Sequence, residues 1–165
     1  MVDNLAGFSL LNQDSHAYWM EQAFREAEKA YVTKEVPVGA IVVLNNQIIG
    51  RGYNQREALN DPTAHAEILA ITAAANHLND WRLKDATLYV TLEPCPMCAG
   101  AILNARIPKL VFGADDLDHG ACGGAIQLCS GKFLNHKVEI IGGILESSCK
   151  GLLDSFFQES RSLKK

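Results

Sequence analysis

Apolar side chains recur with helical spacing near both ends of the chain. Near the start they occupy the i, i+4, i+7 and i+11 positions of one helical face: Met20, Phe24, Ala27 and Tyr31. Asp14 or Ser15 can cap this helix. Near the end, a segment that begins at Ser147 carries a second apolar stripe: Leu152, Leu153, Phe156 and Phe157. The pattern predicts one amphipathic helix at each end.

Short apolar runs between these two helices predict strands. The runs span residues 36–44, 47–53, 86–92, 109–113 and 137–141. Asn45-Asn46 separates the first two runs and predicts a tight hairpin turn. These runs predict five strands.

Further helices are predicted from Asp61-Pro62-Thr63 to His77, from just after Pro94 to about Arg106, and over residues 125–129. A strand, a helix and a strand between residues 86 and 113 are typical of a parallel crossover. The fold class predicted is α/β, with three α/β/α layers and a five-stranded mixed sheet. Residues 14–165 are predicted to form a single domain, preceded by a lead-in over residues 1–13.

Composition is that of a globular domain with a full core. The chain has 165 residues, of which 48% are hydrophobic and 21% charged, and this balance excludes disorder and a coiled coil. No apolar run approaches the roughly 20 residues that span a bilayer. The start of the chain resembles no signal peptide, so a cytoplasmic location is expected. The net charge of −4 means that nucleic acid could bind only through a local basic patch.

The five cysteines do not form a pattern of paired disulfides. Their number is odd, and only Cys95 and Cys98 are close in sequence. In a reducing compartment such a pair is suited to metal binding or redox chemistry. No histidine or cysteine lies at a metal-binding spacing from the other three, which are predicted to be small buried or surface thiols: Cys122, Cys129 and Cys149.

Two clusters carry candidate chemistry, and each lies where a helix is predicted to begin. They are His65-Ala66-Glu67 and Pro94-Cys95-Pro96-Met97-Cys98. Cysteines at i and i+3 lie on one side of a first helical turn, so both sulfurs can reach one ion. One imidazole and two thiolates make three ligands, which is the number found in catalytic zinc sites. Taken singly, Glu67 also suits a surface carboxylate and Cys-x-x-Cys also suits a redox pair.

The combined motif resembles that of the zinc-dependent nucleobase deaminases, in which His-x-Glu precedes Pro-Cys-x-x-Cys. Residues 35–40, 61–67, 86–95 and 97–101 are similar to the bacterial tRNA-specific adenosine deaminases. The similarity extends over roughly residues 16 to 161. It implies a cytidine-deaminase-like fold and hydrolytic conversion of adenosine to inosine at the wobble position (34) of a tRNA anticodon.

The resemblance also implies the role of each motif residue. One Zn²⁺ per subunit is held by His65, Cys95 and Cys98, and Glu67 is the catalytic proton shuttle. The implied substrate contacts are Asn54, the main chain of Ala66, and Phe156. The implied partners are a tRNA anticodon loop and a second copy of the chain in a homodimer, with no membrane.

The aromatic pair near the end of the chain has two alternative roles, and several charged residues bear on phosphate binding. Phe156 and Phe157 can stack on flanking nucleotides, but the stripe that they complete also suits packing against the core. Asp115, Asp118 and Glu159 add negative charge that opposes phosphate binding. The basic candidates for phosphate contact are Arg51, Arg56, Lys109, Lys132 and Arg161.

Three other functions compete with tRNA deamination. A deaminase of a free base or nucleotide, such as guanine or deoxycytidylate, shares the zinc motif. A catalytically silent zinc-containing RNA-binding subunit would be expected to lack Glu67. A structural zinc knuckle needs a fourth protein ligand, and none is apparent in the sequence.

Overall fold

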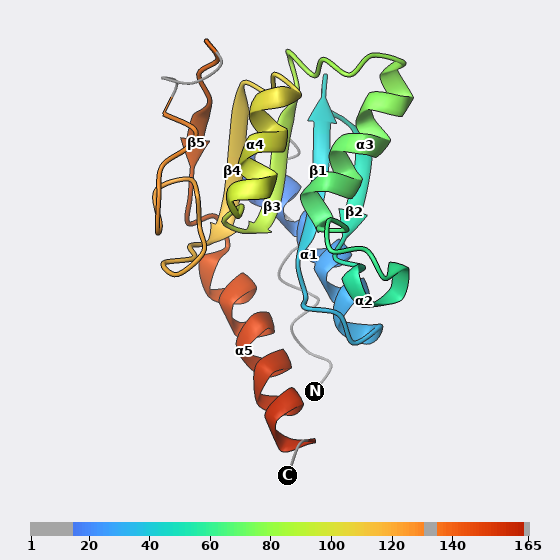
Figure 1. The fold of residues 1–165 in the computed structure, drawn as a ribbon, viewed down its shortest axis with the longest axis vertical. Helices are drawn as coiled ribbons and strands as arrows, with labels where there is room; N and C mark the ends of the chain where they lie inside the picture. The colour runs from blue at the N-terminus through green and yellow to red at the C-terminus, as the bar shows by residue number, and fades with distance from the viewer. Residues whose placement is uncertain (1–14, 131–134, 164–165) are drawn as a thin grey trace.

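The computed structural model describes residues 15–130 and 135–163, and it contains a five-stranded mixed sheet (Figure 1). The strands are β1 (Gly39–Leu44), β2 (Gln47–Tyr53), β3 (Thr87–Leu92), β4 (Lys109–Ala114) and β5 (Glu139–Ile141). Their order is β2-β1-β3-β4-β5. Strands β3, β4 and β5 pair in parallel, and β1 pairs antiparallel with both of its neighbours. The predicted fold class and mixed sheet are confirmed.

Helices cover both faces of the sheet. They are α1 (His16–Val32), α2 (Arg56–Leu59), α3 (Ala66–Leu78), α4 (Pro96–Asn104) and α5 (Glu146–Ser162). In Figure 1, α3 and α4 lie side by side in front of the sheet, α1 lies behind it, and α5 continues beyond its lower end. No helix among the described residues is long and apolar enough to span a bilayer. The lead-in over residues 1–13 lies outside the described residues.

Alternation along the strands builds a core on each face of the sheet. In β3, Leu88 and Val90 are fully buried in the cluster that also holds residues of α3 and α4. Tyr89, between them, is buried in the other cluster, with Met20 of α1 and Cys149 of α5. Side chains of a strand point alternately to its two faces, so both faces of β3 are covered. This pattern gives the three layers that the sequence predicts.

The approach of α3 to β2 depends on two glycines. A Cβ at Gly50 would lie 2.3 Å from the carbonyl oxygen of Ala70, and one at Gly52 would lie 2.3 Å from that of Ala66. Both distances are shorter than any van der Waals contact, so only glycine permits this spacing. Alanine at positions 66, 70 and 74 keeps the facing side of α3 equally flat. The first turn of α3, with His65 as its N-cap, is thereby held directly over the hairpin.

Two predicted helices differ from the structure, and one helix of the structure was not predicted. The helix predicted to start at Asp61-Pro62-Thr63 begins at Ala66, because the amide and hydroxyl of Thr63 bind the Asp61 carboxylate in a local turn. The predicted helix over residues 125–129 is absent, and an isolated bridge joins Cys122 to Gln127 instead. The four-residue α2 was not predicted; it depends on a cap from Glu35, which is distant in sequence.

Other boundaries agree closely with the pattern. Ser15 is the N-cap of α1, and its hydroxyl accepts a hydrogen bond from the amide of Tyr18; Asp14, the alternative cap, lies outside the described residues. Asn45 and Asn46 both have positive φ angles, 50° and 57°, as the predicted tight turn requires. β2 and β4 start at the predicted residues and β3 starts one residue later, whereas β1 and β5 start at Gly39 and Glu139 rather than at residues 36 and 137.

The glycine contact yields a test of packing. We expect Gly52→Ala to lower the free energy of unfolding by about 1–3 kcal/mol, because the added methyl group must push α3 away from β2. Urea denaturation followed by circular dichroism measures this change. Gly151→Ala is the matched control, since a Cβ at Gly151 meets no atom within 4 Å. Equal stability of the two variants would show that α3 does not depend on this contact.

Candidate active site

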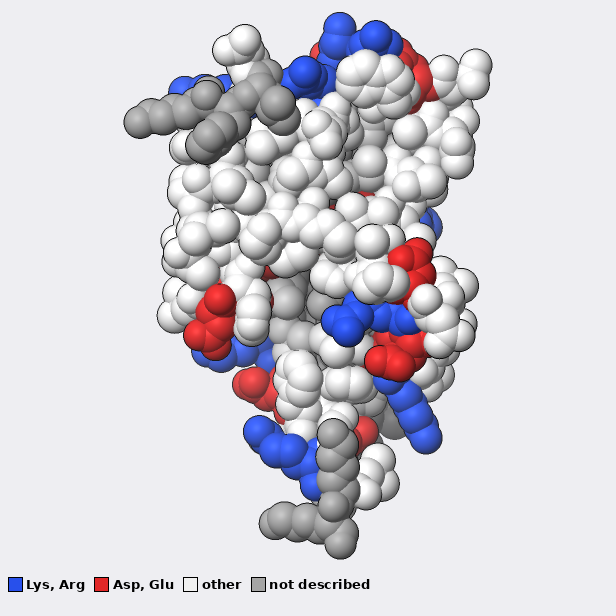
Figure 2. All heavy atoms as spheres, viewed as in Figure 1, with Lys and Arg blue, Asp and Glu red and all other residues white. Residues whose placement is uncertain are grey.

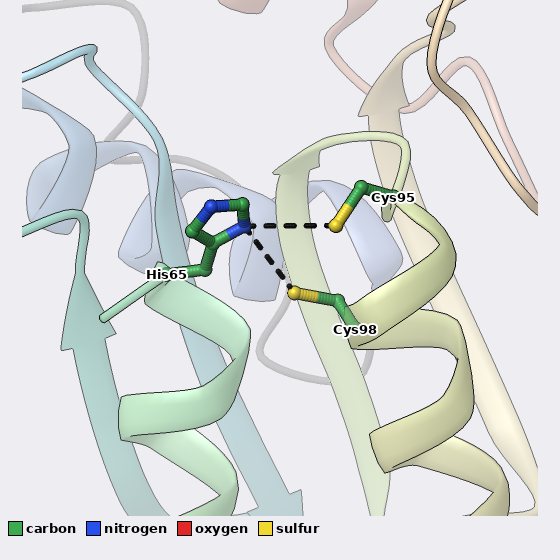
Figure 3. A group of neighbouring side chains, drawn as sticks. All are labelled: His65, Cys95 and Cys98. Carbon is green, nitrogen blue, oxygen red and sulfur yellow. Dashed lines mark hydrogen bonds between the residues drawn. The ribbon is translucent and has the colours of Figure 1, made fainter. Parts of the chain in front are cut away.

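Three potential metal ligands meet where two helices begin. His65 is the N-cap of α3, Cys95 is the N-cap of α4, and Cys98 lies in the first turn of α4. Pro96 occupies the start of α4, where a missing N–H costs no helical hydrogen bond. Figure 3 shows the imidazole of His65 pointing from the start of α3 toward both sulfurs. These are the three residues whose spacing predicts a zinc site.

The separations within this cluster fit a tetrahedral metal site. His65 Nδ1 lies 3.6 Å from Cys95 Sγ and 3.5 Å from Cys98 Sγ. Bonds of about 2.3 Å to sulfur and about 2.0–2.1 Å to nitrogen, at tetrahedral angles, place such ligand atoms about 3.6 Å apart. Among the described residues, His65, Cys95 and Cys98 are the potential ligands whose side-chain atoms lie close enough together to hold one ion. The donor set suits zinc and leaves one coordination position open.

Cys95 and His65 stabilise each other in charged form, whereas Cys98 is held in its neutral form. The pKa of Cys95 is lowered to about 4, first because the Cys98 thiol donates a hydrogen bond to it and further because of His65. The pKa of Cys98 is raised, by the same hydrogen bond and by burial. The hydrogen bond with Cys95 also raises the pKa of His65. Metal ligation needs thiolates, so binding must release the proton that Cys98 retains.

Glu67 lies beside this cluster and is not one of its three ligands. Glu67 is in the first turn of α3, and only 4% of its surface is exposed. It lines the pocket in front of the cluster. Burial raises the pKa of its carboxyl group to about 7, against the opposing effects of its own backbone amide and of His65. A carboxyl group whose pKa is near neutral can both accept and donate a proton.

The pocket has a volume of about 660 Å³, and segments distant in sequence form its walls. One wall is the segment after β2, with Asn54 and Arg56. The Asn54 amide donates to the carbonyl of Val36 over 3.3 Å, which fixes its plane. The buried carboxylate of Glu35 accepts hydrogen bonds from the amides of Glu57 and Ala58 and so holds α2 in place.

The opposite wall is the segment after β4, and α5 adds side chains to it. The pocket-lining residues of this wall are Asp115, Asp116, Leu117, His119, Lys150, Leu153, Asp154 and Phe157. No sequence pattern singled out Leu117, His119 or Lys150, because they belong to an irregular segment and to a helix face that only the folded chain brings to the pocket.

The predicted substrate residues occupy different places. Asn54 and Ala66 line the pocket. The ring of Phe156 instead packs edge-on against Tyr31, with the ring centroids 6.0 Å apart, and lies 5.5 Å from the ring of Phe157. Phe157 lines the pocket and is 45% exposed. Substrate contact by Phe156 stays a prediction, and Phe157 is the aromatic side chain at the pocket itself.

The basic candidates are also spread over the molecule. Arg56 lines the pocket, whereas Arg51 pairs with Glu26 and Lys109 pairs with Glu139. Arg161 is in the last turn of α5 and does not line the pocket, and Lys132 lies outside the described residues. Of the three acidic residues that oppose phosphate binding, Asp115 alone lines the pocket. The carboxylate of Glu159 accepts a hydrogen bond from Tyr31.

The remaining three cysteines are buried. The sulfurs of Cys122 and Cys129 are 3.5 Å apart, and Cys149 packs in the core behind the sheet. None belongs to the metal-binding group found among the described residues. Of the two settings predicted for these thiols, buried or on the surface, the structure shows the buried one.

Comparison with known proteins places this site in a family. The MafB19-like deaminase family matches residues 14–161. The chain is 48% identical over 147 residues to the tRNA-specific adenosine deaminase of Bacillus subtilis, covering 89% of this chain and 91% of that protein. It is 46% identical over 147 residues to the enzyme of that name from Haemophilus influenzae, covering 88% of this chain and 85% of the relative.

Solved structures agree with these relatives. A tRNA:A34 deaminase, described in a study of A-to-I editing at the wobble position of transfer RNA, superposes with a TM-score of 0.79 and 43% identity. The match covers 82% of this chain and 98% of that one. A guanine deaminase from Nitrosomonas europaea, 21% identical with a TM-score of 0.76, shares the fold and covers 86% and 84% of the two chains. The chain therefore belongs to the cytidine deaminase-like superfamily, and within it to the family of the tRNA-specific adenosine deaminases.

Proposed function

We propose that this protein deaminates adenosine to inosine by hydrolysis at the wobble position (34) of a tRNA anticodon. The observation that carries the proposal is a buried Glu67 beside a group of three potential ligands, in a chain that covers 91% of a tRNA-specific adenosine deaminase at 48% identity. Such a substrate implies a cytoplasmic location. The reaction consumes one water and releases ammonia, so no redox cofactor is needed.

The three ligands of the proposed metal are His65, Cys95 and Cys98, with one Zn²⁺ per subunit. When bound, zinc with one open position lowers the pKa of a water molecule to near neutrality and so supplies hydroxide as a nucleophile. The start of each helix directs partial positive charge at the site, which favours the thiolates over the thiols.

Glu67 is the proposed proton shuttle. Its carboxylate takes a proton from the attacking water, delivers one to N1 of the purine as C6 is attacked, and then helps to protonate the leaving ammonia. A residue in this role must change its protonation state during turnover. The burial that brings its pKa to about 7 supports this assignment.

Recognition of the base is assigned to residues around the pocket. The Asn54 amide can donate to and accept from a purine edge, and Ala66, as the first residue of α3, has an N–H without an intrahelical partner. Phe156 is proposed to contact substrate together with Phe157, whose exposed ring can stack on a flanking base. An anticodon loop is unpaired, so its bases can leave the stack at low cost.

Replacement of Glu67 separates catalysis from metal binding. We expect Glu67→Gln to retain about one zinc per chain and to lower kcat by about 10²–10⁴-fold, because the amide cannot transfer the proton. Cys98→Ala should lose zinc as well as activity. Inductively coupled plasma mass spectrometry and a single-turnover inosine assay measure the two properties. Glu28→Gln, on the exposed face of α1, is the control. Activity within a few-fold of wild type in Glu67→Gln would refute the assigned role.

The substrate class can be tested through salt and base identity. An anticodon stem-loop with A at position 34 should be converted to inosine, and its affinity should fall as salt rises, with a slope of about −0.7 per phosphate contact. Arg56→Gln and Lys150→Gln, at the pocket, should each reduce that slope by about 0.7. Lys29→Gln, whose side chain pairs with Glu26 on α1, should leave it unchanged.

The same assay decides between tRNA and a small substrate. A stem-loop whose wobble base is changed should not be deaminated, and free guanine and deoxycytidylate should not be turned over. Turnover of either small molecule, with stem-loop affinity independent of salt, would replace the proposal by a free-base or nucleotide deaminase.

A homodimer is proposed through the face over α3 and α4. Among aspartate, glutamate, lysine and arginine, these two helices contain one residue, Glu67, and it is buried. Figure 2 shows this face as almost free of charge, with acidic and basic side chains both above and below it. A groove of about 360 Å³ crosses it, lined by Ile68, Ile71, Trp81 and Ala101 among others. An apolar surface of this kind is typical of a subunit interface.

We expect Ile71→Glu to make the protein monomeric, because a charge in this groove would be buried without a partner in the dimer. Sedimentation equilibrium at micromolar concentration measures the state. Val32→Glu is the matched control; Val32 is 80% exposed at the end of α1, away from this face, and its replacement should leave a dimer. A monomeric wild-type protein, or a dimeric Ile71→Glu, would contradict the proposed interface.

A further inference from the structure

Glu93 is a buried carboxylate that the proposed chemistry does not use. It follows β3, two residues before Cys95, and is 3% exposed. Within residues 15–130 and 135–163, no ion pair involves it. Its carboxylate instead accepts three backbone hydrogen bonds: Oε2 from the amide of Asp116 at 2.9 Å, and Oε1 from those of Cys122 at 3.0 Å and Gly124 at 2.7 Å.

All three amides belong to one segment, residues 115–124, which we call the wall segment. It follows β4, contains no helix or strand, and supplies Asp115, Asp116, Leu117 and His119 to the pocket. Backbone bonds from Glu93 N to Ala114 O, just before the segment, and from Ala121 N to Pro94 O, within it, are each 2.8 Å long and tie the segment to the end of β3. The amides of Asp118 and His119 bond to Oδ1 of Asp116 inside the segment, so among the described residues Glu93 is the side chain outside the segment to which its amides converge.

Two glycines allow the wall segment to close around this carboxylate. A Cβ at Gly120 would lie 2.4 Å from Glu93 Cδ, and one at Gly124 would lie 2.6 Å from Glu93 Oε2 and 2.2 Å from the carbonyl oxygen of Asp116. Any side chain at either position would separate the segment from the carboxylate. Hydrogen bonds to an ionised acceptor are about twice as strong as neutral ones, so three of them define the path of an otherwise irregular segment.

We propose that Glu93 is a positioning residue: by holding the wall segment, its carboxylate sets the shape of the pocket wall opposite Asn54 and thereby the fit of the substrate. This inference rests on the proposed function for the identity of the substrate. Glu93 acts through the segment and is assigned no role in metal binding or proton transfer.

Glu93→Gln tests the proposal directly. The amide nitrogen of glutamine cannot accept a hydrogen bond, so at least one of the three backbone donors loses its acceptor. We expect the amide protons of Asp116, Cys122 and Gly124 to exchange with solvent at least about tenfold faster, as measured by NMR. The KM for the anticodon stem-loop should rise about tenfold with kcat within about threefold, as expected when binding contacts outside the reacting atoms are lost. Zinc content should stay at one per chain.

A second variant leaves the carboxylate in place. Gly124→Ala should displace the wall segment and raise KM to a similar extent, so it carries the test if Glu93→Gln does not fold. Gly151→Ala, where a Cβ meets no atom, controls for the added methyl group. Glu21→Gln controls for the loss of a buried carboxylate, since Glu21 is 7% exposed and pairs with Arg25 on α1.

Three results would overturn the proposal. Unchanged exchange of the three amides would show that Glu93 does not hold the segment, and faster exchange with unchanged KM would show that the segment does not position substrate. Loss of zinc in Glu93→Gln would place the residue in the metal site instead. If the wild-type protein deaminates no stem-loop, the proposed function fails, and amide exchange still decides whether Glu93 holds the wall segment.

Discussion

The start of α3 must lie beside the start of α4, because the candidate metal site draws one ligand from the first helix and two from the second. His65 is 30 residues from Cys95 and 33 from Cys98, so only the sheet can set their separation. α3 packs closely on Gly50 and Gly52, and this contact fixes the distance between α3 and β2. The parallel pairing of β3 with β4 fixes the path of α4, which connects them. A shift of about 1 Å in either helix would separate ligand atoms that a zinc ion needs about 3.6 Å apart.

The buried glutamates around the pocket serve two different purposes. The number of backbone amides that donate hydrogen bonds to each carboxylate distinguishes them. Glu35 and Glu93 each accept hydrogen bonds from backbone amides and hold opposite walls. Glu67 lies beside the ligand cluster, and burial raises the pKa of its carboxyl group to about 7. A carboxylate committed to several amide donors is suited to holding structure, whereas one that is desolvated without them is suited to exchanging protons.

Two surfaces lie next to the site: the face over α3 and α4, and the rim of the pocket. They differ in the number of charged side chains, so each suits a different partner. The face over α3 and α4 is almost uncharged, and a second copy of the chain is its proposed partner. The pocket rim mixes Arg56 and Lys150 with Asp115 and Asp154. A net charge of −4 repels RNA at long range, so affinity would depend on these few cations and on contacts to the bases.

By itself, the sequence determined the α/β class, the five strands and the pair Cys95 and Cys98, because each depends on local spacing: alternation for a strand, i and i+3 for the two cysteines. His65 was assigned to the same site through the motif as a whole, since it is 30 residues from Cys95. Asn54, Ala66, Arg56 and Asp115 were also singled out from the sequence and line the pocket, but tertiary structure alone decided its other contacts. It turned Phe157 rather than Phe156 to the pocket, brought Lys150 to its rim, and used Glu35 to cap a helix 21 residues away that local propensity did not indicate. Residues 125–129 resembled a helix but follow the wall segment that Glu93 holds. Side-chain to backbone contacts between distant segments have no period in the sequence, so only the folded chain reveals them.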